Sequence, residues 1–287
     1  MSERYAIVVD GTAALPAELA RELDISFLPV HVNFGEQSFT QGVDLSFDQF
    51  YERLAKPDAK PTTSQPSLGE CREVYEAALA KGATRILVVT LATELSGTYS
   101  AAVTAAQQHE QPIEVIDSRA TAGSTSLIAT ACARARAKGA SFEDAVALAK
   151  KLQGNVKLRA IIDTLEQLKR SGRASGMQAM FGSLLKVKPI IKIENGKLEP
   201  IDKVRTREKA MARLQELIEA EVPPGEKLHA SVIHTNEPTR AKALADWLSG
   251  RYHCVELYTA EAGPAIATHG GQGVLGVCWY PESLLAS

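Results

Sequence analysis

Two hydroxyl-rich segments are the first candidates for chemistry in this sequence. Residues 61–67 read PTTSQPS and include Thr63 and Ser64, and residues 94–98 read ELSGT, with Ser96 and Gly97 near the centre. The second segment follows an apolar strand-like run and opens a helical one. A helix N-terminus offers unpaired N–H groups to an anion, glycine lets the backbone approach it, and serine adds a hydroxyl donor. Together the segments indicate a carboxylate or phosphate site, although the first alone is also typical of a turn before a capped helix.

His269 precedes a glycine-rich segment, residues 271–276 (GQGVLG). The segment matches the pattern of a dinucleotide-binding loop, but too little chain follows it to complete the βαβ unit which that loop opens. We expect it to let the backbone approach a neighbour or a ligand, with His269 in a glycine-flanked loop. With Ser96 as nucleophile and Asp10 or Asp117 as orienting group, His269 would form a serine-hydrolase triad, but the GxSxG elbow of that class is missing around Ser96.

The balance of charges argues against nucleic acid as a partner. The 287 residues contain 32 Lys and Arg against 34 Asp and Glu, a formal net charge of -2, which leaves no basic surplus to release counterions from a phosphate backbone. The four cysteines are far apart and form neither a CxxC pair nor a spaced set with the histidines, so the sequence predicts no structural metal and no disulfide framework. No apolar run has the length of a signal-peptide core or a membrane span, and we expect a cytoplasmic protein.

Short β-branched runs alternate with amphipathic segments through the first half of the chain. Strands are predicted at residues 5–9, 25–34, 85–91 and 113–116, and helices near 47–55 and 68–81. Ser46 with Gln49, and Ser67 with Glu70, have the spacing of a capping box, in which the hydroxyl and the later side chain satisfy free N–H groups. Strands that alternate with helices are typical of a mostly parallel sheet covered on both faces.

The second half of the chain changes character and predicts a separate domain. Asn195-Gly196, between residues 188–193 and 197–204, is the strongest short-range signal of a β-hairpin. The segments that follow predict helices at 207–220 and 239–248 and strands at 229–234, 254–258 and 274–279. One hydrophobic core seldom serves a chain of this length, so we expect an α/β protein of two domains, residues 1–155 with the parallel sheet and residues 156–287 with a mixed sheet.

The order of these motifs resembles the DegV family over almost the whole chain. The resemblance is carried by the stretch after His269 and by residues 9–13 (VDGTA), 61–67 (PTTSQPS), 95–99 (LSGTY), 115–118 (VIDS), 163–165 (DTL), 168–173 (LKRSGR) and 185–189 (LKVKP). The best-understood members of the family are fatty-acid-binding subunits of bacterial fatty acid kinase. The resemblance therefore implies the two-domain DegV-like fold and a bound long-chain fatty acid, with no cofactor, no metal and no catalytic residue.

The resemblance also assigns roles to individual residues. It implies that five of them surround the fatty-acid carboxylate: Thr63, Ser64, Ser96, Gly97 and His269. Arg173 would lie near the pocket entrance, where the phosphate is added and the kinase subunit docks. The chain departs from the family pattern at Ala14, where Asp is common, and at Gly270 and Gln272, where the family usually has Thr and Pro.

By this resemblance the chain binds a long-chain fatty acid, with transient membrane contact, and presents its carboxylate to a fatty acid kinase subunit for acyl-phosphate formation. Two alternatives stay open: a serine hydrolase or acyltransferase that uses Ser96, and a lipid carrier or sensor without a kinase partner. The length and saturation of the acyl chain depend on the side chains that close the far end of the pocket, which the sequence does not identify.

Overall fold

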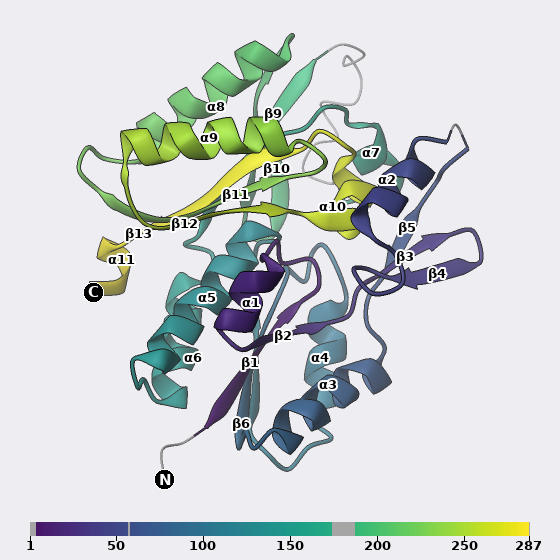
Figure 1. Cartoon of the computed structure of the whole chain (residues 1–287), viewed down its shortest axis with the longest axis vertical. Helices are drawn as coiled ribbons and strands as arrows, with labels where there is room; N and C mark the ends of the chain where they lie inside the picture. The colour runs from purple at the N-terminus through teal and green to yellow at the C-terminus, as the bar shows by residue number, and fades with distance from the viewer. Residues whose placement is uncertain (1–3, 57, 174–186, 287) are drawn as a thin grey trace.

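The computed structural model describes residues 4–56, 58–173 and 187–286. Two sheets dominate the mixed α/β structure (Figure 1). The first consists of parallel strands in the order β2-β1-β6-β7. Its members are β1 (Tyr5–Asp10), β2 (Ile25–Leu28), β6 (Arg85–Thr90) and β7 (Ile113–Asp117). The parallel sheet predicted from the first half of the sequence is therefore confirmed.

Helices cover both faces of the parallel sheet. One face carries α3 (Leu68–Ala80) and α4 (Thr98–Ala106), and the other carries α1 (Ala17–Glu22), α5 (Gly123–Ala137) and α6 (Phe142–Leu152). The alternation of side chains along β1 explains this arrangement, because Val8 packs into the cluster with α3 and α4 while Ile7 and Val9 pack into the cluster with α5 and α6. Both faces of the strands are therefore apolar, as buried parallel strands require.

The second sheet is mixed and has the strand order β10-β9-β8-β13-β11-β12. Its members are β8 (Lys157–Ile161), β9 (Lys188–Glu194), β10 (Lys197–Val204), β11 (Lys227–His234), β12 (His253–Glu261) and β13 (Leu275–Pro281). Its outer face packs against α8 (Arg207–Glu221) and α9 (Pro238–Arg251). Its inner face packs against α5, which contacts both large sheets and lies between them (Figure 1).

A small antiparallel sheet lies beside the two large ones. It has the order β4-β3-β5 and consists of β3 (His31–Phe34), β4 (Gln37–Thr40) and β5 (Thr62–Ser64). Together with α2 (Phe47–Leu54) it forms a satellite core that includes Ala267 of α10 (Gly263–Gly270). The remaining short helices are α7 (Glu166–Ser171) and α11 (Ser283–Ala286).

Several local predictions are confirmed by hydrogen bonds and backbone angles. Both predicted capping boxes form, at Ser46 before α2 and at Ser67 before α3. The predicted hairpin forms between β9 and β10, and its turn residues Asn195 and Gly196 have φ of 49° and 79°, the left-handed pair that a two-residue hairpin turn needs. No described helix has both the length and the apolar character to cross a membrane.

The single strand predicted over residues 25–34 is wrong. The chain forms β2 up to Leu28 and then β3 from His31, and the two belong to different sheets. Pro29 lies at the break, where its missing N–H group cannot join a strand ladder, and Val30 packs closely against Gly11. Strand β8 is an element that the sequence did not predict. The domain boundary near residue 155 stays a prediction, because the largest core cluster includes side chains from both large sheets.

Candidate functional site

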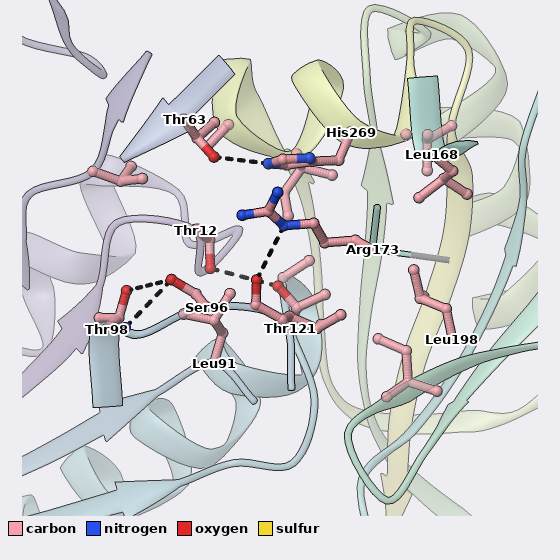
Figure 2. Close-up of a pocket in the computed structure, with 18 of the residues that line it drawn as sticks. Thr12, Thr63, Leu91, Ser96, Thr98, Thr121, Leu168, Arg173, Leu198 and His269 are labelled. Atoms are coloured by element: carbon pink, nitrogen blue, oxygen red, sulfur yellow. Dashed lines mark hydrogen bonds between the residues drawn. The ribbon is translucent and has the colours of Figure 1, made fainter. Parts of the chain in front are cut away.

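A cavity of about 300 Å³ lies between the parallel sheet, the small sheet and the inner face of the mixed sheet. Its polar lining comes from strand ends and turns of the first half of the chain and from α10, at Thr12, Thr63, Ser96, Gly97, Thr121 and His269. Its apolar lining comes mainly from the mixed sheet and includes Leu158, Ile162, Ile191, Ile193, Leu198 and Ile233. Figure 2 shows the hydroxyl groups on one side and Leu168 and Leu198 on the other, so the cavity is amphipathic.

Thr63 and His269 meet at the polar end. Thr63 lies on β5, where alternation along the strand leaves Thr62 and Ser64 exposed and turns Thr63 inward. Its Oγ1 lies 2.8 Å from Nε2 of His269. Ser64 also borders the cavity, but its hydroxyl accepts a hydrogen bond from the Asn33 amide at 3.4 Å on the exposed side of the strand. The two predicted hydroxyl residues of this segment therefore face different surroundings.

His269 lies in the last turn of α10 and not in the glycine-flanked loop that the sequence suggested. Pro264 stands in the first turn of the helix, and Gly271, with φ of 81°, ends it. Among the glycines after His269, Gly271 thus ends the helix. Gly273 allows the chain to pack closely against a neighbouring segment, since a Cβ there would lie 2.8 Å from the Asp163 side chain. The expected close backbone approach in this segment is confirmed.

His269 is a neutral imidazole at neutral pH. Burial, together with the smaller effect of the positive charges of Arg173 and Arg170, lowers its pKa to about 4. Its Nδ1 is buried without a hydrogen-bond partner in the part of the chain that the structure describes. The imidazole can therefore orient a hydroxyl or a ligand by hydrogen bonding, but it supplies no resting positive charge.

Ser96 and Gly97 lie in the turn between β6 and α4. The Thr98 N–H group donates to Ser96 Oγ at 3.3 Å, and the hydroxyls of Ser96 and Thr98 are 2.9 Å apart. When the Thr98 hydroxyl also donates to the Ser96 oxygen, the hydrogen of Ser96 is left to point into the cavity. Gly97 is the N-cap residue of α4, and a Cβ there would lie 2.1 Å from Oε1 of Gln65. Glycine at this position allows the 61–67 segment to pack against the turn.

Thr12, Gln65 and Thr121 line the same cavity, although the sequence did not single them out. The Asp10 carboxylate accepts hydrogen bonds from the N–H and hydroxyl groups of Thr12 and from the Leu91 N–H group, and so joins the ends of β1 and β6. The sequence could have indicated Thr12 as a cavity residue, because Thr12 follows Asp10 at the carboxyl end of a parallel strand, where ligands of open α/β sheets bind. Gln65 and Thr121 have no comparable signal.

Arg173 follows α7, whose C-cap residue Gly172 has φ of 73°, the left-handed conformation that glycine adopts readily. The residue is exposed, and its Nε and Nη1 donate to the carbonyl oxygens of Leu95 and Ser171 at 3.5 Å and 2.6 Å. In Figure 2 the guanidinium lies between His269 and Ser96. All six residues implied by the resemblance thus border one cavity, with Arg173 at its exposed side.

One known protein family matches almost the whole chain. A family model described as an uncharacterised protein of the DegV family matches residues 4–282. The chain belongs to the DegV family. Protein DegV of Bacillus subtilis is 36% identical over 277 residues, or 96% of this chain and 98% of that protein.

Solved structures of DegV proteins have the same two-domain α/β fold. The structure of DegV from Bacillus subtilis, a fatty acid binding protein, is 35% identical with a TM-score of 0.87, covering 97% of this chain and 99% of that chain. A structure that describes fatty acid binding of a DegV family protein from Thermus thermophilus is 28% identical with a TM-score of 0.90 and the same coverage. The fold predicted from the sequence is therefore confirmed. Of the DegV motifs, residues 185 and 186 lie outside the described residues.

The hydrogen bonds of this DegV-family chain do not assemble the serine-hydrolase triad. His269 bonds to Thr63, Ser96 bonds to Thr98, and Asp10 holds Thr12 and Leu91. The Asp117 carboxylate accepts from Thr93 and from the Arg119 N–H group. No group of three His, Cys, Asp or Glu side chains that could hold a metal ion occurs among residues 4–56, 58–173 and 187–286. The described site offers neutral hydrogen-bond donors beside an apolar wall, with the guanidinium of Arg173 at its exposed side.

Proposed function

We propose that this chain binds a long-chain fatty acid, with the carboxylate among Thr63, Ser64, Ser96, Gly97 and His269 and the acyl chain along the mixed sheet. The observation that carries the proposal is the amphipathic cavity, in which hydroxyl groups gather at one side and aliphatic side chains at the other. The solved DegV relatives described as fatty acid binding add support, because they match almost the whole chain.

The polar end suits a carboxylate. The Ser96 hydroxyl has a hydrogen to donate when Thr98 donates to its oxygen, and Gly97 is the N-cap of α4, whose N-terminus favours a negative charge. Thr63 also has a hydrogen to donate if His269 is protonated at Nε2 and donates to its oxygen. Neutral donors that are fixed in place stabilise an anion without the large cost of burying an unpaired cation.

The apolar wall supplies the affinity relative to water. Burial of a chain of about 15 methylene groups contributes roughly 12 kcal/mol at about 0.8 kcal/mol each. Association itself costs about 4 to 15 kcal/mol, so the tail and the head-group hydrogen bonds must act together. A bilayer offers the tail a similar apolar environment, and uptake from a membrane during transient contact therefore depends on enclosure and on the polar end.

The proposed role of the bound carboxylate is to accept a phosphoryl group from a separate ATP-dependent kinase in the cytoplasm. A carboxylate is a weak nucleophile, and its attack on a γ-phosphate needs mainly positioning and charge neutralisation. The sequence has no GxxxxGK[ST] motif, so the nucleotide and its metal would be held by the partner. Arg173 is exposed beside the polar end and would face the transferred phosphate or an acidic surface of that partner.

The test begins with the ligand. Full-length chain is purified from a bacterial host and analysed by native mass spectrometry and by extraction of bound lipid. The proposal expects one non-covalent fatty acid per chain, and a chain that stays empty after incubation with a range of long-chain acids contradicts it. Labelling of Ser96 by a fluorophosphonate with turnover of an ester would support the hydrolase instead. A carrier or sensor without a kinase would bind the acid but form no acyl phosphate with any bacterial fatty acid kinase.

A further inference from the structure

Two hydroxyl groups in the cavity wall stand apart from the proposed carboxylate site. Oγ1 of Thr12 and Oγ1 of Thr121 lie 3.5 Å from each other, at the long end of the hydrogen-bond range. In Figure 2 both lie between Ser96 on one side and Leu198 on the other. An acyl chain that runs from the polar end to the apolar wall would therefore pass this pair close to its head group.

The hydrogen of the Thr12 hydroxyl is already used. The Asp10 carboxylate is 1% exposed, and one of its oxygens accepts both the N–H and the hydroxyl of Thr12 while the other accepts the Leu91 N–H at 2.6 Å. Toward the cavity, the Thr12 oxygen can thus act only as an acceptor. An ionised carboxylate, which also can only accept, gains nothing there.

Thr121 supplies the complementary donor. It lies two residues before the start of α5, and the residue between them, Ala122, has φ of 51° and ψ of -128° although it is not glycine. This backbone conformation is unfavourable for any residue with a Cβ, and such strain persists where the surrounding structure holds it and often at functional positions. The strained peptide holds Thr121 beside Thr12, where its hydroxyl hydrogen can be given to Thr12 or to a ligand.

The pair therefore offers one acceptor and one donor to the same point of the cavity. Methylene groups satisfy neither, so the Thr12 oxygen has no donor and the Thr121 hydroxyl no acceptor in the cavity beyond their long contact with each other. A ligand hydroxyl satisfies both, since it can donate to Thr12 and accept from Thr121. We propose that the cavity prefers a fatty acid that carries a hydroxyl group near its carboxyl end, an inference that rests on the proposed fatty-acid binding.

The experiment compares three acids on the delipidated full-length chain. The dissociation constants of palmitic acid, β-hydroxypalmitic acid and ω-hydroxypalmitic acid are measured by displacement of a fluorescent fatty acid. We expect β-hydroxypalmitic acid to bind about tenfold more tightly than palmitic acid. The ω-hydroxyl isomer should bind less tightly than palmitic acid, because its hydroxyl would lie in the apolar part of the cavity.

Variants of Thr121 test whether this residue causes the preference for the β-hydroxyl acid. Thr121→Val should remove the preference for the β-hydroxyl acid, Thr121→Ser should retain it, and the exposed Thr104→Val of α4 should leave it unchanged. Thr121 is chosen over Thr12 because Thr12 also holds Asp10, and thermal melts verify that each variant is folded.

The outcomes separate this inference from the proposed function. Equal affinities of the chain for palmitic and β-hydroxypalmitic acid, or a preference that survives Thr121→Val, overturn the inference while fatty-acid binding stands. If Thr121→Val lowers the affinity for both acids by the same factor, the two hydroxyls bind the carboxylate, and this result also overturns the inference. Binding of none of the acids contradicts the proposed function itself.

Discussion

Oγ1 of Thr63 lies 2.8 Å from Nε2 of His269, although 206 positions separate the two residues. The contact joins the small antiparallel sheet to α10 and closes the polar end of the cavity. Since burial and two nearby arginines lower the pKa of His269, the contact is a hydrogen bond between neutral groups. A shift of the 61–67 segment would therefore also change the position of His269.

This link predicts that the two residues act as a unit in fatty-acid binding. Thr63→Val and His269→Phe should each weaken the binding of palmitic acid, and the double variant should lose less than the sum by about 1 kcal/mol, the scale of one hydrogen bond. A double-mutant cycle measured by isothermal titration calorimetry gives this coupling. Thr62→Val, on the exposed side of the same strand, is the matched control. Strictly additive losses would mean that the two residues bind the ligand independently.

Loss of the Ser96 hydroxyl should weaken fatty-acid binding without unfolding the chain. Ser96→Ala removes a donor from the proposed carboxylate site. The loss of one hydrogen bond to the anion should weaken the binding free energy by about 1 to 3 kcal/mol, or roughly 5- to 150-fold in the dissociation constant. Ser100→Ala, exposed on the same helix, is the control. Unchanged affinity of Ser96→Ala would place the carboxylate elsewhere in the cavity.

The lowered pKa of His269 predicts a pH dependence of stability in the empty protein. In the unfolded chain the imidazole takes up a proton below its ordinary pKa of 6.5, whereas in the folded chain it does so only near 4. The unfolded state therefore binds more protons between these values, and the free energy of unfolding should fall as the pH drops from 6.5 towards 4, by at most about 3 kcal/mol. Denaturant melts over this pH range measure the free energy of unfolding of the wild type and of His269→Gln. The loss of stability with falling pH should be smaller in the variant, and the contribution of His269 to it should be absent above the ordinary pKa.

A bound carboxylate should act on His269 in the opposite direction. A negative charge beside the imidazole favours its protonated form, so palmitic acid should raise the pKa of His269. An NMR titration of the ring signals with and without ligand tests this. An identical titration in both states would show that the head group binds away from His269.

Gly97→Ala should disturb the site through Gln65. The φ of -76° at Gly97 is open to any residue, but a Cβ would lie 2.1 Å from the Gln65 amide oxygen, which must move. Because the far end of a flexible side chain can shift, we expect near-normal thermal stability and a loss of about 1 kcal/mol in fatty-acid binding. Adding Gln65→Ala should restore affinity, and Gly69→Ala, where a Cβ meets only an ordinary contact, is the control. No recovery in the double variant would contradict the steric explanation.

Arg173→Ala should separate ligand binding from phosphorylation. The guanidinium is exposed and bonds only to carbonyl oxygens among the described residues, so fatty-acid affinity and melting temperature should stay near those of the wild type. Acyl-phosphate formation with a cognate kinase should slow by about tenfold or more, as loss of charge complementarity at a docking surface allows. Arg72→Ala, exposed on α3, is the control. A melting temperature that falls in proportion to turnover would favour a role in ending the helix at Gly172.

The local features of this fold could be predicted because neighbouring residues decide them. The hydroxyl of Ser67 and the side chain of Glu70 need only the helix they begin, and Asn195 and Gly196 need only the two strands they join. The same holds for the turn with Ser96 and Gly97, since a hydroxyl and a glycine before a helix form an anion site wherever that helix packs. The sequence by itself therefore determined these caps and turns, the parallel sheet and the kind of ligand group expected.

Only the tertiary structure decided which segments meet. The break at Pro29 depends on a third sheet that no local sequence pattern predicts. The placement of His269 at a helix end depends on how α10 packs against α2 and the small sheet. The contact of Thr12 with Thr121 depends on the register of separate strands and on the strained backbone at Ala122. These relationships follow from long-range packing, whose free energy is shared among many distant side chains, and so they are absent from any single stretch of sequence.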